Sequence, residues 1–405
     1  MDLVKSLRGM NDLIGTDSEK FNYIIQIASK IAKQYGFSYI ETPLLEETAL
    51  FKRSVGESSD IVGKEMYQFI DKGKNDVSLR PEGTAGVVRS YIEHKLDKRG
   101  SKEKFFYYGA MFRYERPQKG RLRLFHQFGC ESFGESSVFE DASIILMIRD
   151  IFEALGIRYR LKINSLGCSQ CMPKYRELLI TDLEEKKEHL CNDCKRRIET
   201  NPIRTLDCKV ESCKEKLESS PKITDNLCET CDRDFTKLQE ILIQNGLEFE
   251  IDKNLVRGLD YYTKTAFEFV SDEVGSQNAI AGGGRYDRLV EFLGGKPTPA
   301  VGFAIGIERI MDLVQLEERD LEGYYFGVLD SEYLDTLFNL ASQKRRWTKV
   351  HIEYKKRSLK SHLKNCLKMG YRYCAVLGSD EVENGTIWVK DLKNKDEDIF
   401  SQSDF

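Results

Sequence analysis

The sequence has few features of a secreted, membrane-bound or strongly charged protein. Its 405 residues contain no apolar run long enough to cross a bilayer. The first residues, MDLVKSLRGMNDLIG, lack the apolar core of a signal peptide. The formal net charge is only −4, so the chain as a whole is not drawn to nucleic acid or to an anionic membrane. We therefore expect a cytoplasmic protein without a membrane partner, in a compartment where thiols stay reduced.

Internal repeats and low-complexity tracts are also absent, and the length allows two or three domains. Residues 105–133 predict two antiparallel strands around a loop near ERPQKG. Strands and helices elsewhere predict an α+β domain over residues 1–320, interrupted at about 168–245 by a charged, mostly helical insertion. After a linker over residues 315–323, alternating strands and helices predict a small α/β domain over residues 324–405.

Cysteines are concentrated in the expected insertion, where eight of the eleven lie. Most form C-x-x-C pairs, which in a reduced compartment suggest a metal site rather than disulfides. The first two pairs predict a structural zinc site at Cys168, Cys171, Cys191 and Cys194. The others could form a second, more loosely spaced site at Cys208, Cys213, Cys228 and Cys231. The alternative is a set of small buried residues that pack the helices.

A local basic patch occupies residues 344–368 of the small domain. It holds ten Lys or Arg residues against one acid, with Trp347 and Tyr354 among them. Cations and aromatic rings together are typical of a nucleic-acid surface. A solvated helix face is the alternative explanation for such a run of charge.

The predicted hairpin has an unusual polar face. Period-two alternation in its second strand gathers charged and polar residues with one aromatic ring on the same side. These residues are Arg121, Arg123, Phe125, Gln127, Gly129 and Glu131. On the first strand, Arg113 and Glu115 also share a face. Since arginine pairs well with phosphate, such a face could hold a long ligand with an anionic part, although a charged outer face is the simpler alternative.

Four further segments support a binding site. LRPEGTAGVVRS (79–90) offers Glu82 and Thr84 before a helix, and VRGLDYYTKTAFEF (256–269) offers Arg257 and two tyrosines. AGGGRYD (281–287) has glycines that allow the backbone to approach a ligand. AIGIERI (304–310) places Glu308 and Arg309 at the start of a helix. Each segment could be structural by itself, but together they indicate a site.

Taken together, these motifs resemble those of the histidyl-tRNA synthetases, a family of class II aminoacyl-tRNA synthetases. The resemblance extends from SLRGMNDL to TIWVKDL. A first helix and a strand that ends at Pro43 resemble motif 1, a dimer element; FRYERPQKGRLRLFHQ resembles motif 2, and AIGIERI motif 3. LRPEGT, VRGLDYYT and AGGGRYD resemble the more specific signatures of the histidine enzymes.

The resemblance implies a six-stranded antiparallel catalytic sheet flanked by helices, an inserted domain and a C-terminal α/β anticodon-binding domain. It also implies a homodimer that activates histidine with ATP and Mg²⁺ and transfers it from histidyl-adenylate to histidine tRNA. Relatives as a rule add a final helix after the segment that corresponds to KDLKNKDEDIF, so we expect a reduced anticodon-binding domain.

The resemblance also implies site residues. Arg113 and Arg257 would contact the α-phosphate of ATP, Phe125 and Arg309 would sandwich adenine, and Arg121 would lie near the pyrophosphate. Residues expected to bind histidine are Glu82, Thr84, Gln127, Glu131, Arg257, Tyr261, Tyr262 and Tyr286. A zinc ion in the insertion is expected to lie far from this chemistry and to act only through folding.

Two other functions remain open. The regulatory subunit of ATP phosphoribosyltransferase resembles the same catalytic domain, but it lacks the anticodon-binding domain and its adenylation residues are degraded. A zinc-dependent RNA-binding protein without catalysis would explain the cysteines and the basic patch. It would leave PEGT and RGLDYY unexplained.

Overall fold

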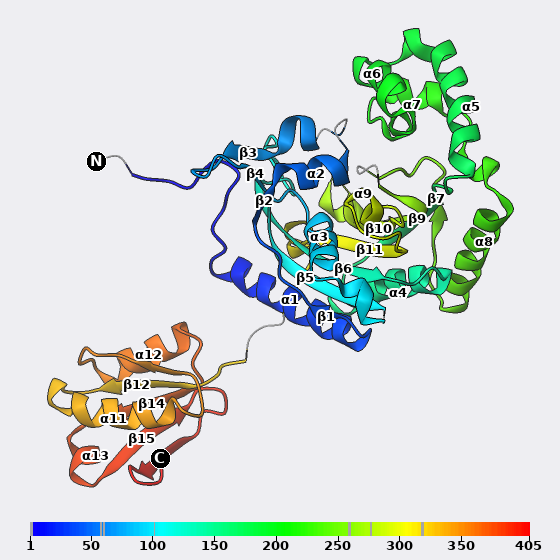
Figure 1. Ribbon diagram of the computed structural model, residues 1–405. Coiled ribbons are helices and arrows are strands. Elements are labelled where there is room, and N and C mark those ends of the chain that lie inside the picture. Colours follow the sequence, from blue (N-terminus) through cyan, green and yellow to red (C-terminus); the bar gives the residue numbers. More distant parts are fainter. Residues whose placement is uncertain are drawn as a thin grey trace. The chain divides into compact units, whose positions relative to one another are not determined.

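The protein is described here by a computed structural model, which covers residues 3–56, 59, 61–100, 102–257, 261–275, 278–316 and 320–405. The chain divides into two compact units, Met1–Gln315 and Leu316–Phe405 (Figure 1). The boundary falls inside the expected linker over residues 315–323. Among the described residues, no helix combines the length and the apolar character needed to cross a membrane.

The first unit is built on a sheet with the strand order β1-β5-β6-β11-β10-β9-β7-β8. Its six inner strands, from β5 to β7, are antiparallel, as expected. The two-residue edge strands β1 and β8 run parallel to their neighbours. The strands are β1 Ser38–Tyr39, β5 Glu103–Phe112, β6 Leu124–Phe133, β7 Arg160–Ser165, β8 Glu250–Ile251, β9 Thr263–Val270, β10 Ala279–Arg285 and β11 Ala300–Gly306.

Helices cover the sheet because each has one apolar face. In α1 (Thr16–Gln34), the residues Ile24, Ala28, Ile31 and Ala32 recur at helical spacing and are buried. This helix packs against α4 (Val138–Ala154) and against the sheet. A small second sheet has the order β2-β4-β3. The remaining elements of this part are β2 Leu45–Glu47, α2 Thr48–Val55, η1 Ile61–Glu65, β3 Tyr67–Ile70, β4 Asp76–Leu79, α3 Thr84–Glu93, η2 Leu96–Arg99, η6 Asp272–Val274, α9 Leu289–Phe292 and α10 Ile307–Met311.

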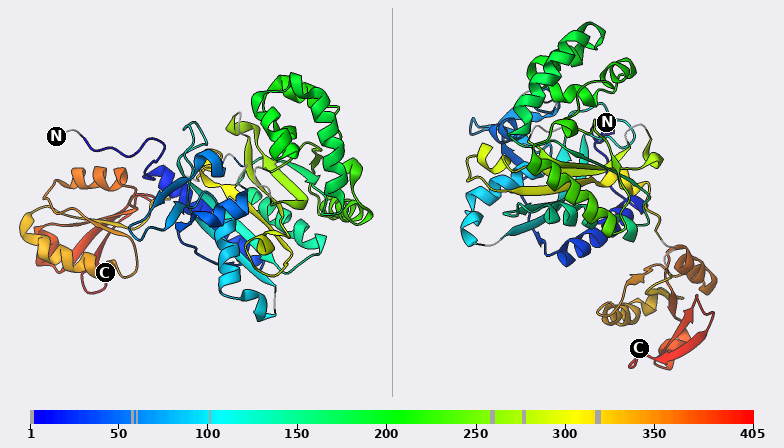
Figure 2. Two further views of the ribbon diagram at one scale, coloured as in Figure 1. Left: turned by 45° about the horizontal axis from the view of Figure 1, so that its top comes forward. Right: turned by 90° about the vertical axis from the view of Figure 1, so that its right-hand side faces the viewer.

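A helical insertion connects β7 to β8 and is drawn in green at one end of the first unit (Figures 1 and 2). Its helices are α5 Cys171–Lys186, η3 Lys187–His189, α6 Asn192–Thr200, η4 Pro202–Asp207, α7 Glu211–Leu217, η5 Ile223–Asn226 and α8 Glu229–Gln244. Buried leucines, Tyr175, Ile198 and cysteines form its own apolar cluster. The segment that was expected to be a mostly helical insertion, about 168–245, contains these helices.

The second unit is a five-stranded sheet with the order β13-β12-β14-β15-β16. Its first three strands are parallel, and β15 and β16 add an antiparallel edge. Separate apolar clusters, one around Phe326 and one around Tyr325, form its core. Its elements are β12 Tyr324–Val328, η7 Ser331–Tyr333, α11 Leu334–Lys344, β13 Val350–Ile352, α12 Leu359–Lys368, β14 Tyr373–Leu377, α13 Ser379–Glu383, β15 Thr386–Asp391 and β16 Glu397–Ser401.

Candidate active site

A cavity of about 800 Å³ lies in the first unit, where the four sequence segments and the hairpin converge. Its walls include the start of α3, the hairpin between β5 and β6, strands β9 to β11 and the start of α10. The sequence-predicted residues on its wall are Glu82, Thr84, Arg113, Arg121, Phe125, Gln127, Arg257, Tyr261, Tyr262 and Arg309. Residues 258–260 of the RGLDYY motif lie outside the described residues.

Arg257 reaches into the cavity across strand β10. Its Nη1 donates to Oε1 of Glu268 at 2.6 Å, and its guanidinium carbon lies 6.0 Å from the ring centre of Tyr262. Within the described part of the chain, its buried Nε has no hydrogen-bond partner. A Cβ on Gly282 would overlap this guanidinium, so one glycine of AGGG makes room for an arginine of the site itself.

Arg113 stands at the end of β5. Its Nε donates to the carbonyl of Pro81 at 2.9 Å, and its guanidinium carbon lies 5.1 Å from the ring centre of Phe125. The hydrogen bond to the Pro81 carbonyl fixes Arg113 between the PEGT segment and the hairpin. A cation and an aromatic face thus stand together on the cavity wall.

Arg309 and Arg121 supply further positive charge. Arg309 donates from Nη1 to the carbonyl of Ala279 at 2.6 Å and from Nε to that of Gly120 at 3.1 Å. Burial and the nearby charges of Arg113 and Arg121 lower the pKa of Arg309. Because these cations repel one another, an anion in the cavity would relieve the repulsion.

The position of Arg121 corrects one expectation. The alternation placed Arg121, Arg123 and Arg113 on strand faces, but β5 ends at Phe112 and β6 begins at Leu124. The Arg113 N–H still donates to the Arg123 carbonyl at 2.9 Å, but the Arg123 N–H donates outside the hairpin, to the Gly9 carbonyl at 2.8 Å. Arg121 forms an ion pair with Glu115, so both belong to the loop that borders the cavity.

Glu82 and Thr84 form the polar end of the cavity. The Glu82 carboxylate accepts from the N–H groups of Thr84 at 2.7 Å and of Ala85 at 2.8 Å, which anchors it to the start of α3. Burial raises the pKa of Glu82. Nearby, Oε1 of Gln127 is buried and has no hydrogen-bond partner among the described residues. An acceptor left open in this way suits a ligand with N–H donors.

Glu131 and Tyr286 do not line this cavity; they lie buried behind Thr84. Glu131 accepts from the hydroxyls of Thr84 at 2.7 Å and Tyr107 at 3.2 Å, and also from that of Tyr286. Burial raises the pKa of Glu131 to about 8, and the hydroxyl donors only partly oppose this rise. Glu131 was expected to bind histidine, but three hydroxyl groups already donate hydrogen bonds to its carboxyl.

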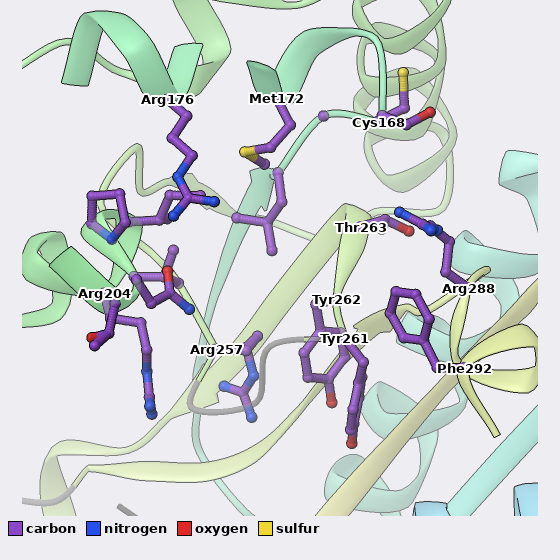
Figure 3. Close-up of a pocket in the computed structure, with 18 residues that line it drawn as sticks. Cys168, Met172, Arg176, Arg204, Arg257, Tyr261, Tyr262, Thr263, Arg288 and Phe292 are labelled. Atoms are coloured by element: carbon purple, nitrogen blue, oxygen red, sulfur yellow. The ribbon is translucent and has the colours of Figure 1, made fainter. Parts of the chain in front are cut away.

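A second cavity of about 290 Å³ adjoins the first and shares its residues Val256, Arg257, Tyr261 and Tyr262 (Figure 3). Its other wall belongs to the insertion, which contributes Cys168, Met172, Arg176 and Arg204, among others. Cys168 therefore lines a cavity that Arg257, Tyr261 and Tyr262 also line.

The structure also regroups the cysteines. The pairs were expected in sequence order, but Cys168 and Cys171 meet Cys228 and Cys231, and Cys191 and Cys194 meet Cys208 and Cys213. The reason is that the last helix of the insertion returns to its start, which brings the first and last pairs together. Within each group all four sulfur atoms lie within 4.8 Å of one another.

Two residues of the site, Glu268 and Tyr107, were not singled out from the sequence, and Glu308 was singled out without a partner. Glu268, a lone acid in the apolar strand TAFEFV, holds Arg257. Tyr107 supplies a hydroxyl to Glu131. Glu308 lines the cavity, and its carboxylate accepts from the His126 N–H at 2.8 Å. Only Glu268 could have been recognised from the sequence, because it is a charged residue in an otherwise apolar strand.

Comparisons with known proteins agree on one family. The family model described as "Histidyl-tRNA synthetase" matches residues 9–310, and the model "Anticodon binding domain" matches residues 331–405. A curated relative from Sulfurimonas denitrificans named "Histidine--tRNA ligase" is 64% identical over 395 residues, covering 98% of each chain. A relative of the same name from a Sulfurovum species is 62% identical over 395 residues, again covering 98% of each chain.

A solved structure gives the same result. The apo histidyl-tRNA synthetase of S. aureus superposes with a TM-score of 0.83 at 32% identity, covering 99% of this chain and 98% of that one. The similarity therefore includes both compact units and the insertion between β7 and β8.

Proposed function

The chain belongs to the histidyl-tRNA synthetase family, and on this basis we propose that it is a histidine–tRNA ligase. It joins histidine to ATP to give histidyl-adenylate and pyrophosphate, and then transfers the histidyl group to the 3′ end of histidine tRNA. The observation that carries this proposal is one cavity in which Arg113 and Arg257 face the acceptors Glu82 and Gln127. Such a cavity fits an anionic and a cationic reactant together.

Adenylate formation sets the requirements at the phosphate end. The histidine carboxylate attacks the α-phosphorus of ATP, the bond to the β-phosphate oxygen breaks, and pyrophosphate leaves. Because two anions meet, fixed cations at the α-phosphate lower the barrier. Arg113 and Arg257 have this role, and Mg²⁺ arrives with ATP as the counter-ion of its phosphates.

The rest of ATP lies along the cations of the hairpin. Phe125 and Arg309 hold the adenine ring from its two faces, by stacking and by a cation–π contact. Support comes from the fixed position of Arg309, which is tied to two backbone carbonyls. Arg121 lies near the leaving pyrophosphate, where its ion pair with Glu115 keeps it at the cavity edge.

Histidine occupies the polar end of the cavity. Its ammonium group donates to Glu82, Thr84 and Gln127, and the open Oε1 of Gln127 supports this assignment. The imidazole lies toward the tyrosine pair, Tyr261 and Tyr262. A pocket that pairs both ring nitrogens excludes amino acids that would leave its polar groups unpaired.

Glu131 and Tyr286 complete the imidazole pocket from behind. A carboxyl with a pKa of about 8 is largely protonated at neutral pH, so it can donate one hydrogen bond as well as accept others. When histidine binds, one ring nitrogen of its imidazole replaces one of the three hydroxyl partners of Glu131. The buried carboxyl thus keeps its full number of hydrogen bonds. Tyr286, whose hydroxyl contacts Glu131, positions it.

The second unit binds the tRNA through its anticodon. The family model for anticodon binding covers residues 331–405, and the basic patch 344–368 lies in this unit. In this patch the side chain of Trp347 is 87% exposed and that of Tyr354 is 58% exposed. Exposed rings among cations can stack on unpaired bases.

A homodimer in the cytoplasm is the working form. Large exposed apolar side chains gather in the first 70 residues, where the motif 1 elements lie. They include Leu3, Val4, Leu7, Ile14, Tyr39, Leu44, Leu45, Phe69 and Ile70. Burial of these side chains in a subunit interface would remove apolar surface from water. Light scattering of the purified protein at micromolar concentration should give twice the 46.8 kDa chain mass, and a monomer would contradict the proposal.

The insertion holds structural zinc. In both cysteine groups, neighbouring sulfur atoms lie 3.8 Å apart, as in the pairs Cys168–Cys171 and Cys191–Cys208. A disulfide bond measures about 2.05 Å, whereas four ligands placed tetrahedrally about 2.3 Å from zinc lie about 3.8 Å from one another. Metal analysis of protein purified without added zinc tests this proposal.

The regulatory subunit of ATP phosphoribosyltransferase is the alternative that shares this fold. It has no anticodon-binding domain, whereas this chain has one, and Arg113, Arg257 and Arg309 are all present. Charging with radioactive histidine separates the two functions. The ligase should attach histidine to histidine tRNA but not to a tRNA for another amino acid; a folded protein that attaches none would contradict the proposal.

A further inference from the structure

The two cysteine groups occupy different places in the insertion. The basal group, defined as Cys168, Cys171, Cys228 and Cys231, joins the start of α5 to the start of α8, the first and last helices of the insertion. The distal group, defined as Cys191, Cys194, Cys208 and Cys213, ties α6 to α7 within the insertion.

The basal group has the donor pattern of thiolates. The Cys228 N–H points to Sγ of Cys171 at 3.2 Å, and the Gln170 N–H points to Sγ of Cys168 at 3.4 Å. Cys171 is the first residue of α5, and Cys228 immediately precedes α8. Backbone donors and two helix N-termini favour negative sulfur, which is the form that binds a metal.

The basal group is connected to the tyrosine pair through backbone hydrogen bonds between the chain before Cys168 and Lys264. The Leu166 N–H donates to the carbonyl of Lys264 at 2.6 Å, and the Lys264 N–H donates to the carbonyl of Gly167 at 2.7 Å. Lys264 follows Tyr262 by two residues. Gly167 has a φ of +65°, and a Cβ there would lie 2.8 Å from Cβ of Cys171. The turn that carries Cys168 is therefore packed between the basal group and β9.

A second connection passes through Val256. This residue precedes Arg257 and packs against the apolar cluster of the insertion, which includes Cys171 and Cys231. Cys168 itself lines the 290 Å³ cavity together with Arg257 and Tyr262 (Figure 3). Displacement of the basal sulfurs would thus move both ends of the segment that bears Arg257 and the tyrosines.

We propose that the insertion holds two separate tetrahedral zinc ions, and that the basal one positions Tyr261 and Tyr262 for binding of histidine and Arg257 for the α-phosphate. The distal ion stabilises the tip of the insertion. Both are closed sites with four protein ligands, so neither touches substrate. This inference rests on the proposed zinc binding and on the proposed ligase function.

A matched pair of variants tests whether the basal and the distal zinc ions have different roles. Cys228 and Cys191 each stand immediately before a helix, each is partly buried, and each has a sulfur neighbour at 3.8 Å. In the full-length protein, the parent should contain about two zinc ions per chain, and Cys228→Ser and Cys191→Ser about one each. Cys228→His, which keeps a zinc ligand, should restore two.

Histidine-dependent pyrophosphate exchange gives the second readout. Cys228→Ser should raise KM for histidine about tenfold, as loss of a supporting contact commonly does. Cys228→His should return KM toward the parent value, and Cys191→Ser should raise it much less. Equal KM changes in the two serine variants, with one zinc lost from each, would show that the basal ion has no special effect on the histidine pocket.

The outcomes separate the linked proposals. A parent protein that exchanges pyrophosphate but contains no zinc would overturn the metal sites and leave the ligase function intact. Two zinc ions in a folded protein without exchange would overturn the ligase function instead. If a serine variant does not fold, the zinc content of the parent and the KM of Cys228→His still decide the inference.

Discussion

Arg257 combines three properties at the scale of a single residue. One nitrogen is held by Glu268, another is buried without a partner in the described part of the chain, and the group lines the cavity. A guanidinium held in this way is already oriented before ATP binds, so little reorganisation is needed as charge develops on the α-phosphate.

Arg257→Ala should therefore lower the rate of adenylation about 100-fold, on the scale of about 3 kcal/mol for a lost oxyanion donor. Affinity for histidine should change little, because the ammonium contacts remain. Pyrophosphate exchange at saturating histidine measures the rate. Arg160→Ala, which removes a surface arginine paired with Asp272, is the control. A rate within twofold of the parent would contradict the role of Arg257.

Glu131 gives a prediction about pH. Burial raises its pKa to about 8, from an ordinary value of 4.5. Between these two values the folded protein holds a proton that the unfolded chain releases, so this group's contribution to stability is complete below pH 4.5 and is lost as the pH rises toward 8. Glu131→Gln cannot ionise and should not show this loss.

The free energy of unfolding of Glu131→Gln, relative to the parent, should therefore increase by at least about 1 kcal/mol between pH 5 and pH 9. Urea melts at each pH measure it. Glu248→Gln changes an exposed acid and serves as the control. Curves for Glu131→Gln and the parent that stay parallel across this range would show that Glu131 is ionised in the folded state.

At the scale of secondary structure, the sequence predicted which elements form better than it predicted the residues at which they begin and end. Alternation and aromatic content predicted the hairpin over residues 105–133, and the strands cover 103–112 and 124–133. It did not predict that the strands end before Arg113, Arg121 and Arg123. At Arg123 the end depends on a hydrogen bond to Gly9, which lies more than a hundred residues earlier in the sequence. The predicted grouping of the cysteines was wrong for a similar reason. The observed grouping depends on α8, which brings Cys228 and Cys231 back to the start of the insertion.

The glycines of β10 allow a prediction at the same scale. A Cβ on Gly282 would overlap only the end of the Arg257 side chain, whereas a Cβ on Gly283 would overlap the backbone carbonyl of Gly302 in β11. Gly282→Ala should thus lower pyrophosphate exchange at least tenfold with little change in melting temperature. Gly283→Ala should instead lower the melting temperature markedly. The reverse pattern would contradict the packing described for this strand.

At the scale of the whole molecule, the two units have separate cores, and the residues assigned to ATP and histidine all belong to the first. A fragment of residues 1–315 should therefore keep histidine-dependent pyrophosphate exchange. Its charging of histidine tRNA should fall at least 100-fold in kcat/KM, because the anticodon contacts are lost. A folded fragment that charges tRNA as well as the full chain would show that the second unit has another role.

Histidine-dependent exchange of radioactive pyrophosphate into ATP tests the central claim most directly, because it needs only the cavity, ATP, Mg²⁺ and the amino acid. We expect rapid exchange with histidine and none above background with any of the other nineteen standard amino acids. A folded sample with magnesium that exchanges no pyrophosphate in the presence of histidine, or that exchanges it equally well with another amino acid, would contradict it.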